Sequence, residues 1–246
     1  MSSRHIIKEK STAMNKATQR EKILTVTGVG IFAALAVVVG YATSFIKVSF
    51  LSFDVKDIVI ILSSFIYGPV AGIGVSAIAA VVEFLTYSTT GVYGFVMNFA
   101  SSATFALVAS FVYSRRKSFE FAIVGVFSGV LSVTAVMMLL NMLVTPYYMG
   151  VDISAVIALL PKLLLPFNLA KALFNGGIVL SLYKPIVKAL RRAHLVPQSK
   201  KRTADTATEE AKKVAPVSKN TLLSLVIGIG SAVVALAIII ILMLAN

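Results

Sequence analysis

The chain has 246 residues, of which 58% are hydrophobic and 13% are charged, and its mean hydropathy is +0.91. This composition is too apolar for an ordinary soluble globule of that length, so it indicates an integral membrane protein. The formal net charge is +13, and the absence of cysteine excludes disulfides, thiol nucleophiles and thiolate metal sites.

The chain begins with a basic arm, residues 1–22, and the first predicted membrane helix covers residues 23–45. Its apolar run is too long for the core of a signal peptide, so we expect an uncleaved helix. Residues 46–55 alternate between apolar and polar side chains, which is typical of an extended loop at the membrane surface.

Residues 57–87 can be one long helix or two helices, 57–67 and 69–87, that break at Gly68-Pro69. The distribution of cations favours the break. Three further helices are predicted at 94–113, 121–145 and 168–190. With the break, 19 of the 23 lysines and arginines lie on one side of the membrane, which the positive-inside rule makes cytoplasmic. The helix 57–67 is too short to cross a bilayer, so its ends must extend it or its neighbours must shield it.

The remaining four lysines are balanced by four acids. The lysines are Lys47, Lys56, Lys162 and Lys171, and the acids are Asp54, Asp57, Glu83 and Asp152. The positive charge is therefore a property of the cytoplasmic side, where anionic lipid attracts it. No aromatic residues interleave with the basic runs, so we expect no nucleic acid as a partner. Both histidines lie in polar flanking segments, and no metal site is predicted.

After residue 192 the composition changes. Residues 193–221 are polar and of mixed charge, as in a flexible cytoplasmic linker. Residues 222–246 form a charge-free segment that is long enough for a seventh membrane helix, which would place the C-terminus outside the cell. Gly228 and Ala232 are spaced to pack against another helix, but such pairs are common by chance in apolar helices, and an extra membrane anchor is the favoured interpretation.

Polar residues gather at the predicted outer ends of the helices. Lys171 and Asn168 are three residues apart, so an amide and an ammonium share one helical face. A cation in an apolar helix normally faces a protein interior or a wet cavity. An amide both donates and accepts whereas lysine only donates, so together they can bind an imide-like edge. Aromatic residues surround them, which suits a flat ligand with one polar edge.

Other members of this polar cluster are Asn141, Asn98, Glu83 and Asp54. Each allows a structural interpretation. Asn98 can hydrogen-bond a neighbouring helix, Glu83 can pair with a lysine, and Lys171 can extend to the outer surface. The nearby tyrosines, Tyr147 among them, can form an interfacial aromatic belt.

Five segments together resemble the riboflavin-specific substrate-binding subunit (S component) of energy-coupling factor (ECF) transporters. They are FLSFDVKDI, IYGPVAGIGV, GFVMNFASS, NMLVTPYYM and PFNLAKALFN. The resemblance covers roughly residues 23–192 and implies a compact six-helix membrane bundle with a vitamin pocket on the extracellular side, covered by the first loop. The helix after residue 192 departs from the family pattern.

The resemblance implies that Asn141, Asn168 and Lys171 bind the polar edge of the isoalloxazine ring. Leu51, Phe53 and Asp54 would belong to the covering loop and line the site. It also implies that small residues of the first helix pack on a transmembrane coupling subunit, which acts with two cytoplasmic ATPase subunits. Gly30 with Ala34, and Ala36 with Gly40, offer two small pairs for that contact, and either can face the partner.

The resemblance leads us to expect a multi-pass cell-membrane protein that captures riboflavin outside the cell and holds no cofactor. The phosphorylated form, flavin mononucleotide (FMN), stays open as a ligand. The chain has no phosphate-binding G-x-x-x-x-G-K-[ST] motif, so it is not expected to be an enzyme. Two alternatives are an autonomous carrier for a flavin or another aromatic vitamin, and a membrane scaffold or sensor that recruits partners through its basic tails.

Overall fold

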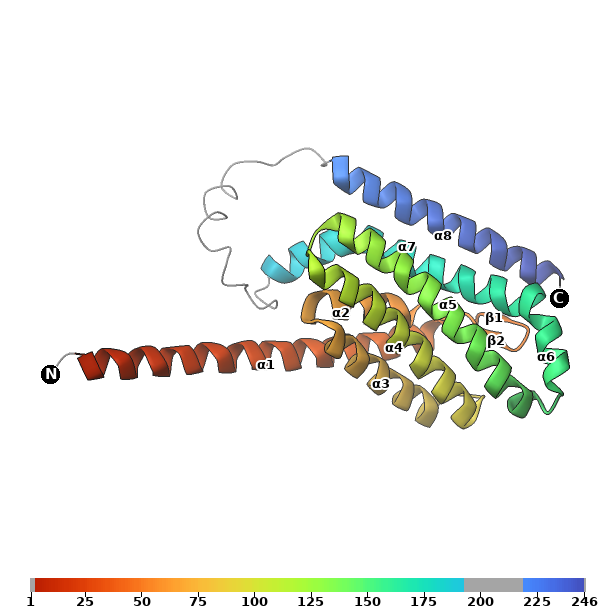
Figure 1. Cartoon of the computed structure of the whole chain (residues 1–246), viewed down its shortest axis with the longest axis horizontal. Helices are drawn as coiled ribbons and strands as arrows, with labels where there is room; N and C mark the ends of the chain where they lie inside the picture. The colour runs from red at the N-terminus through yellow and green to blue at the C-terminus, as the bar shows by residue number, and fades with distance from the viewer. Residues whose placement is uncertain (1–2, 193–218, 246) are drawn as a thin grey trace.

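The computed structural model describes residues 3–192 and 219–245, and these are almost entirely helical (Figure 1). Within them, five helical segments are long and apolar enough to cross a membrane: Gln19–Thr43, Pro69–Thr86, Gly91–Arg115, Phe119–Met149 and Ile153–Leu190. The expectation of an all-α integral membrane protein is confirmed. The predicted linker 193–221 lies outside the described residues up to residue 218.

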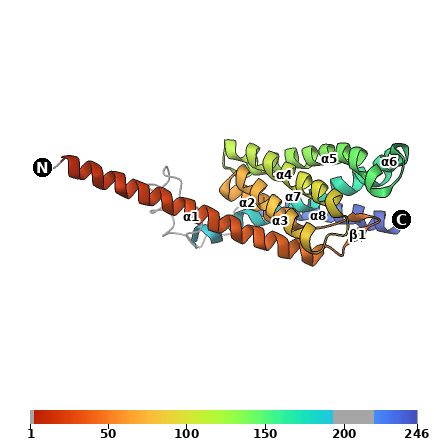
Figure 2. The same cartoon turned by 90° about the horizontal axis from the view of Figure 1, so that it is seen from below.

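Helix α1 covers Ser3–Thr43, so the predicted boundary between a basic arm and a first span at residue 22 is not a structural boundary. No glycine or proline occurs between residue 3 and Gly28, and Lys, Glu, Ala and Gln in this segment all favour a helix. The helix therefore continues through the cationic segment, and its N-terminal part extends well beyond the other helices (Figures 1 and 2).

The predicted break at Gly68-Pro69 is confirmed. Helix α2 covers Lys56–Tyr67 and helix α3 covers Pro69–Thr86, with Gly68 between them at a φ of 100° that favours glycine. Twelve helical residues reach only about 18 Å, well short of a hydrocarbon core of about 30 Å. Neighbouring helices shield α2, since residues 56–65 are buried and α1, α3, α4 and α7 pack around it.

Helix α4 covers Gly91–Arg115, and helix α5 covers Phe119–Met149. Ser118 begins α5 by accepting a hydrogen bond from the Phe121 amide at 3.4 Å. The two helices approach closely because α5 presents Gly125 to the backbone of Ala109 on α4. The predicted end of α5 at residue 145 is too early. Pro146 lies in the last turn, and Gly150, with a φ of 64°, donates its amide hydrogen to the Pro146 carbonyl and ends the helix.

The predicted sixth helix, 168–190, begins too late. The chain is already helical in α6, Ile153–Leu159, continues through a π-helical turn, Leu160–Leu164, and becomes α7, Leu165–Arg192. Pro161 has no amide hydrogen to donate, and the Leu165 amide bonds the Leu160 carbonyl five residues back. Pro161 and Pro166 thus modify a helix in the region between the two predicted helices 121–145 and 168–190.

Helix α8 covers Lys219–Ala245 and lies along α7 (Figures 1 and 2). Gly228 of α8 faces Gly177 of α7 so closely that a Cβ atom on Gly177 would lie 2.6 Å from the Gly228 carbonyl oxygen. The expectation that Gly228 packs against another helix is confirmed, and its partner is α7.

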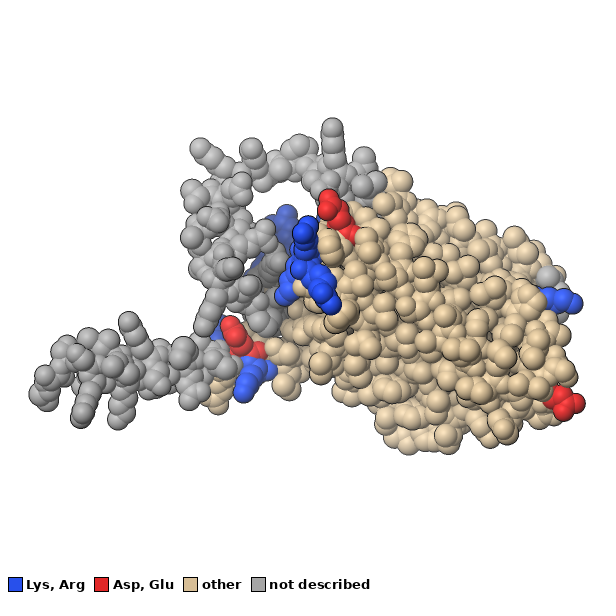
Figure 3. Space-filling model, in the orientation of Figure 1, with Lys and Arg blue, Asp and Glu red and all other residues tan. Residues whose placement is uncertain are grey.

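In the view of Figure 3, many of the described lysine and arginine side chains gather at the end of the bundle from which α1 extends, and a further cation lies at the opposite end. Of two ring contacts at this end, one joins the α4–α5 turn to the start of α5, and the other joins the start of α5 to the C-terminal half of α7. The Arg116 guanidinium lies 5.7 Å from the Phe121 ring centroid, and the Lys184 ammonium lies 4.0 Å from that of Phe119. Cations from distant parts of the chain therefore share one end, as the charge count predicted.

Candidate functional site

A short hairpin lies at the end of the bundle opposite the cations (Figure 1). Its strands are β1, Lys47–Val48, and β2, Leu51–Ser52, paired antiparallel with Val48 opposite Leu51. Ser49 adopts a φ of 57° at the tight turn between them. The extended loop predicted for residues 46–55 is therefore this hairpin and the segment that leads to α2.

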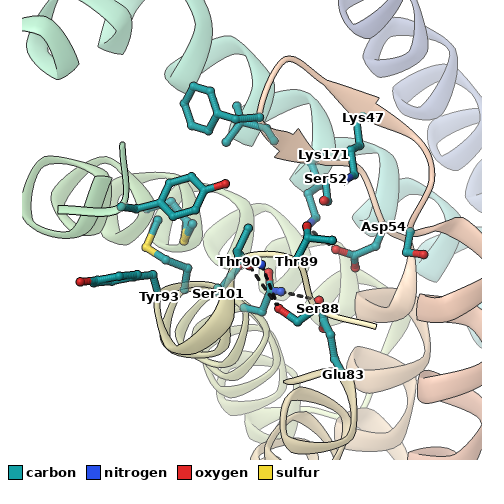
Figure 4. A pocket seen from close by; sticks show the side chains of 18 of the residues that line it. Lys47, Ser52, Asp54, Glu83, Ser88, Thr89, Thr90, Tyr93, Ser101 and Lys171 are labelled. Atoms are coloured by element: carbon teal, nitrogen blue, oxygen red, sulfur yellow. Dashed lines mark hydrogen bonds and ion pairs between the residues drawn. The ribbon is translucent and has the colours of Figure 1, made fainter. Parts of the chain in front are cut away.

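The hairpin covers a cavity of about 430 Å³, a volume typical of small-molecule sites (Figure 4). Seven of the nine predicted ligand-binding residues line it, although they come from the hairpin segment and from α3, α4, α5 and α7. These residues are Leu51, Asp54, Glu83, Asn98, Asn141, Asn168 and Lys171. Residues up to 120 positions apart in the chain thus meet around one space.

The other two predicted residues do not line the cavity. Phe53 is buried beneath the hairpin, where its ring packs against Phe167 at 6.4 Å and Phe174 at 5.3 Å. Tyr147 is 76% exposed on the outer side of α5. Its neighbour Tyr148 lines the cavity instead, because successive helical side chains point about 100° apart. The exposed position of Tyr147 agrees with the interfacial-belt alternative.

An ion-pair chain connects most of the charged residues of the site. Lys171 Nζ lies 2.8 Å from Asp54 Oδ2, which also faces Lys56 Nζ at 3.5 Å. Lys56 Nζ in turn contacts Glu83 Oε2 at 2.6 Å, and Asn98 Nδ2 donates to Glu83 Oε1 at 2.6 Å. Figure 4 shows Lys171 directed at Asp54. Glu83 does pair with a lysine and Asn98 does hydrogen-bond a neighbouring helix, as their structural interpretations predicted. Both residues also line the cavity.

Asp54 lies between α1 and α2, outside the membrane spans. Burial raises the pKa of its carboxyl group, but the ammonium groups of Lys171 and Lys56 lower it by more, to about 2. The carboxylate is therefore ionised at neutral pH. Its Oδ1 is buried and has no hydrogen-bond partner among the described residues, so it is an acceptor directed at the site.

Two buried amides complete the polar edge. Asn141 Nδ2 donates to the Met137 carbonyl at 2.7 Å, and Asn168 Nδ2 donates to the Leu164 carbonyl at 2.8 Å. Each bond fixes the side chain on its own helix and uses one of the two amide hydrogens. Asn141 Oδ1 also accepts a hydrogen bond from Thr145 Oγ1 at 2.9 Å. The second hydrogen of each amide and the Asn168 oxygen give the site both donors and an acceptor beside the Lys171 ammonium.

Several lining residues were not predicted from the sequence. Lys56 is 2% exposed and central to the ion pairs, although its position suggested a loop charge. A signal was present, since Lys56 and Asp57 adjoin an apolar run that forms a buried helix. The turn between α3 and α4 supplies three hydroxyl groups at the cavity, from Ser88, Thr89 and Thr90.

The two small-residue pairs of α1 face different ways. Gly30 and Ala34 are exposed, and a Cβ on Gly30 would meet nothing within 4 Å. Ala36 is fully buried, and Gly40 lines the cavity, where a Cβ would lie 2.9 Å from the Tyr87 hydroxyl oxygen. Of the two pairs, Gly30 and Ala34 are the exposed one, and contact of either pair with a partner stays a prediction.

A family model described as "ECF transporter, substrate-specific component" matches residues 24–187. The riboflavin transporter RibU of Staphylococcus aureus (strain TCH60) is 26% identical over 180 residues, which is 71% of this chain and 94% of that protein. The riboflavin transporter FmnP of Bacillus subtilis (strain 168) is 31% identical over 158 residues, which is 59% of this chain and 83% of that protein.

A solved structure, described as the S component of a bacterial ECF transporter, matches with a TM-score of 0.58 and 26% identity. The match covers 68% of this chain and 98% of that one. All these matches are shorter than the present chain, and the family model ends before α8.

Proposed function

Because the chain belongs to the family of substrate-specific components of ECF transporters, we propose that it is the riboflavin-binding subunit of such a transporter. Two relatives, which the chain matches over 94% and 83% of their lengths, carry the name of riboflavin transporters. The proposal also rests on the site itself, whose chemistry matches a flat, largely apolar ligand with one imide-like edge.

The observation that carries the proposal is the grouping of Asn141, Asn168 and Lys171 on one wall of a covered cavity. An imide edge offers acceptor, donor and acceptor atoms in a row. Amides on α5 and α7 can pair with both kinds of atom, and the Lys171 ammonium can donate to a carbonyl oxygen. Aromatic and thioether side chains on the other walls, from Phe50, Tyr93, Met97 and Met137, suit the faces of a ring system.

Asp54 gives Lys171 a fixed direction. A lysine alone at this position would be free to extend to the surface, but the 2.8 Å bond to Asp54 holds its ammonium beside the cavity. The same carboxylate belongs to the segment that continues the hairpin into α2. Ligand contact at Lys171 and closure of the covering segment are therefore linked through one ion pair.

We propose riboflavin as the ligand and expect no bound cofactor. FMN is the alternative ligand, which the test compares with riboflavin. Lys47 on the hairpin also lines the cavity, and its exposed ammonium is the group there that could meet a phosphate. The more buried polar residues are all at the ring edge. Discrimination between the two flavins therefore depends on the outer end of the cavity.

Transport requires partners in this proposal. The chain has no phosphate-binding loop, so cytoplasmic ATPase subunits would supply the energy through a transmembrane coupling subunit. The exposed face of Gly30 and Ala34 on α1 offers the coupling subunit a close helix contact. In this arrangement the cationic end of the bundle is cytoplasmic, and the hairpin faces outward.

The test is a fluorescence titration of the detergent-purified full chain with riboflavin. We expect saturable quenching, and a loss of about 5- to 150-fold in affinity for Lys171→Ala and for Asn141→Ala, which corresponds to about 1–3 kcal/mol for each lost hydrogen bond. Lys162→Ala is the matched control, because Lys162 is exposed and does not line the cavity. It should bind like the unchanged protein.

Two outcomes would contradict the proposal. Absence of binding by the unchanged protein would remove riboflavin as its ligand. Full affinity in both the Lys171→Ala and Asn141→Ala variants would place the ligand elsewhere. A parallel titration with FMN ranks the two flavins and decides which one the cavity prefers.

A further inference from the structure

Helix α8 lies outside the residues that match the family, yet it contacts the hairpin that covers the cavity. The contact is an apolar cluster that we call the cover cluster. Its buried members come from the hairpin segment, from the π turn with the start of α7, and from α8. They are Val48, Phe53, Leu163, Phe167, Ala170, Ala235, Ile239 and Leu242.

Val48 makes the cover cluster important for the cavity. It is 1% exposed and is paired with Leu51, which lines the cavity. Cross-strand partners share one face of a hairpin and successive residues point to opposite faces. Val48 and Leu51 therefore share the face that packs against the cover cluster, and Lys47 and Ser52, which are paired with each other and line the cavity, lie on the other face. The α8 side chains Ile239 and Leu242 are 3% and 8% exposed, and they belong to the same cluster as Val48.

The position of α8 is defined by a second, independent contact. Gly177 on α7 and Gly228 on α8 allow the two backbones to approach, with Ser181 and Ser231 filling the space beside them. Residues 228, 235, 239 and 242 are buried, and this spacing defines one continuous face of α8. In contrast, Gly230, Ile240 and Ile241 face away from α7.

We propose that α8 is a brace for the hairpin: it packs against α7 through Gly228, holds Val48 through Ile239 and Leu242, and so slows opening of the cover over the ligand cavity. No described residue of α8 lines that cavity, so the brace acts on the cover and not on the ligand. The effect on riboflavin entry and release rests on the proposed function, whereas the effect of α8 on opening of the hairpin does not.

This arrangement predicts a kinetic effect. A contact that stabilises the closed cover equally with and without ligand lowers the rate of ligand entry and the rate of ligand release by the same factor. Its loss should therefore accelerate both rates and leave the dissociation constant nearly unchanged. For the same reason, truncation after Arg192 should leave riboflavin affinity within about threefold of the full chain.

The experiment compares two matched pairs of variants in the full-length protein. Ile239→Ala removes a buried contact with the cover cluster, and Ile240→Ala removes a 48% exposed side chain one position away. Gly228→Ala introduces a Cβ against the backbone of Gly177, and Gly230→Ala introduces one into open space. Stopped-flow quenching gives the association and dissociation rates of riboflavin.

We expect Ile239→Ala and Gly228→Ala to raise both rates by about fivefold or more, equivalent to about 1 kcal/mol, and to change the dissociation constant by less than about threefold. Their controls should match the unchanged protein. Equal rates in Ile239→Ala and Ile240→Ala would overturn the proposal. A loss of affinity above tenfold at constant dissociation rate would also overturn it, because α8 would then act on the ligand site.

A second measurement needs no ligand. Hydrogen exchange of the peptide that contains residues 46–55 reports opening of the hairpin directly. It should be about fivefold faster in Ile239→Ala than in Ile240→Ala in protein without flavin. If this difference appears but no variant binds riboflavin, the brace is correct and the proposed ligand is wrong. If riboflavin binds and exchange is identical in the two variants, the brace is wrong and the ligand stands.

Discussion

Asp54 is the residue on which the two lysines of the site depend. Its carboxylate contacts Lys171 at 2.8 Å and Lys56 at 3.5 Å, and all three side chains are largely buried. A buried charge without a partner is costly, so removal of one member of such a group destabilises a protein more than the group itself stabilises it. The arrangement therefore makes Asp54 important for stability as well as for the direction of Lys171.

The pH dependence of this group follows from the lowered pKa of Asp54. The folded value of about 2 lies below the ordinary 3.8, so the stabilisation is complete above about pH 4 and is lost as pH falls through about 2. We expect Asp54→Asn to lower the free energy of unfolding by about 3–5 kcal/mol. That difference from the unchanged protein should be constant between pH 8 and pH 5.

Thermal unfolding of both proteins across this pH range measures the difference. Asp152→Asn serves as the control, since Asp152 is exposed and its side chain makes no capping hydrogen bond. A difference that shrank by half between pH 8 and pH 5 would mean that Asp54 is protonated far more easily than its contacts with Lys171 and Lys56 imply.

The polar residues of the site could be predicted because each is unusual in its own segment. Asn168 and Lys171 interrupt an apolar helix, and Asn141 interrupts another, so composition alone marks them. Phe53 and Tyr147 could not be placed in the same way. Apolar and aromatic residues are common on every face of a membrane helix, and only the packing decides that Tyr148 enters the cavity while Tyr147 does not.

Helix boundaries were predictable where a single glycine or proline determines the local backbone conformation. The φ of 100° at Gly68 and the proline that follows it separate α2 from α3, as the charge pattern required. Pro146, Pro161 and Pro166 have weaker effects. Helix α5 continues through Pro146, and the chain stays helical around Pro161 and Pro166 by forming a π-helical turn. Tertiary packing offsets the backbone hydrogen bonds that these prolines cannot make.

Close contact between α4 and α5 depends on a glycine whose replacement gives a matched test. A Cβ on Gly125 would lie 2.5 Å from the Ala109 carbonyl oxygen, whereas a Cβ on Gly74 of α3 would meet nothing within 4 Å. We expect Gly125→Ala to destabilise the protein by about 1–3 kcal/mol through overpacking. Gly74→Ala should be neutral or stabilising by up to about 1 kcal/mol, because alanine favours a helix more than glycine.

Thermal unfolding in detergent compares the two variants under identical conditions. The order of their stabilities is the decisive observation. If Gly74→Ala were the less stable of the two, the crossing of α4 and α5 would not be the close backbone contact that the structure shows.

At the scale of the whole molecule, charge and function separate toward opposite ends. The cations of the α4–α5 turn and of α7 gather where α1 extends, and the cavity with its hairpin lies at the other end (Figures 1 and 3). Leu242, near the C-terminal end of α8, belongs to the cover cluster with Val48. The C-terminal end of α8 therefore lies on the hairpin side, while the C-terminal half of α7 lies on the cationic side.

This polarity predicts how the protein is oriented in the membrane. Positively charged loops remain cytoplasmic, so the α4–α5 turn should face the cytoplasm and the α5–α6 turn should face outward with the hairpin. The chain contains no cysteine, so a single introduced thiol reports one position without background. Lys117→Cys marks the cationic turn and keeps Arg115 and Arg116, and Val151→Cys marks the opposite turn, where the side chain is 37% exposed.

In intact cells, a membrane-impermeant maleimide should label Val151→Cys and leave Lys117→Cys unmodified, and permeabilised cells should label both. The physical reason is the transfer cost of the cationic turn and of the basic segments that precede and follow the bundle in the sequence, which together oppose translocation. Labelling of Lys117→Cys alone in intact cells would show that the protein has the opposite orientation in the membrane. The cavity would then open to the cytoplasm, and capture of an external vitamin by this site would be excluded.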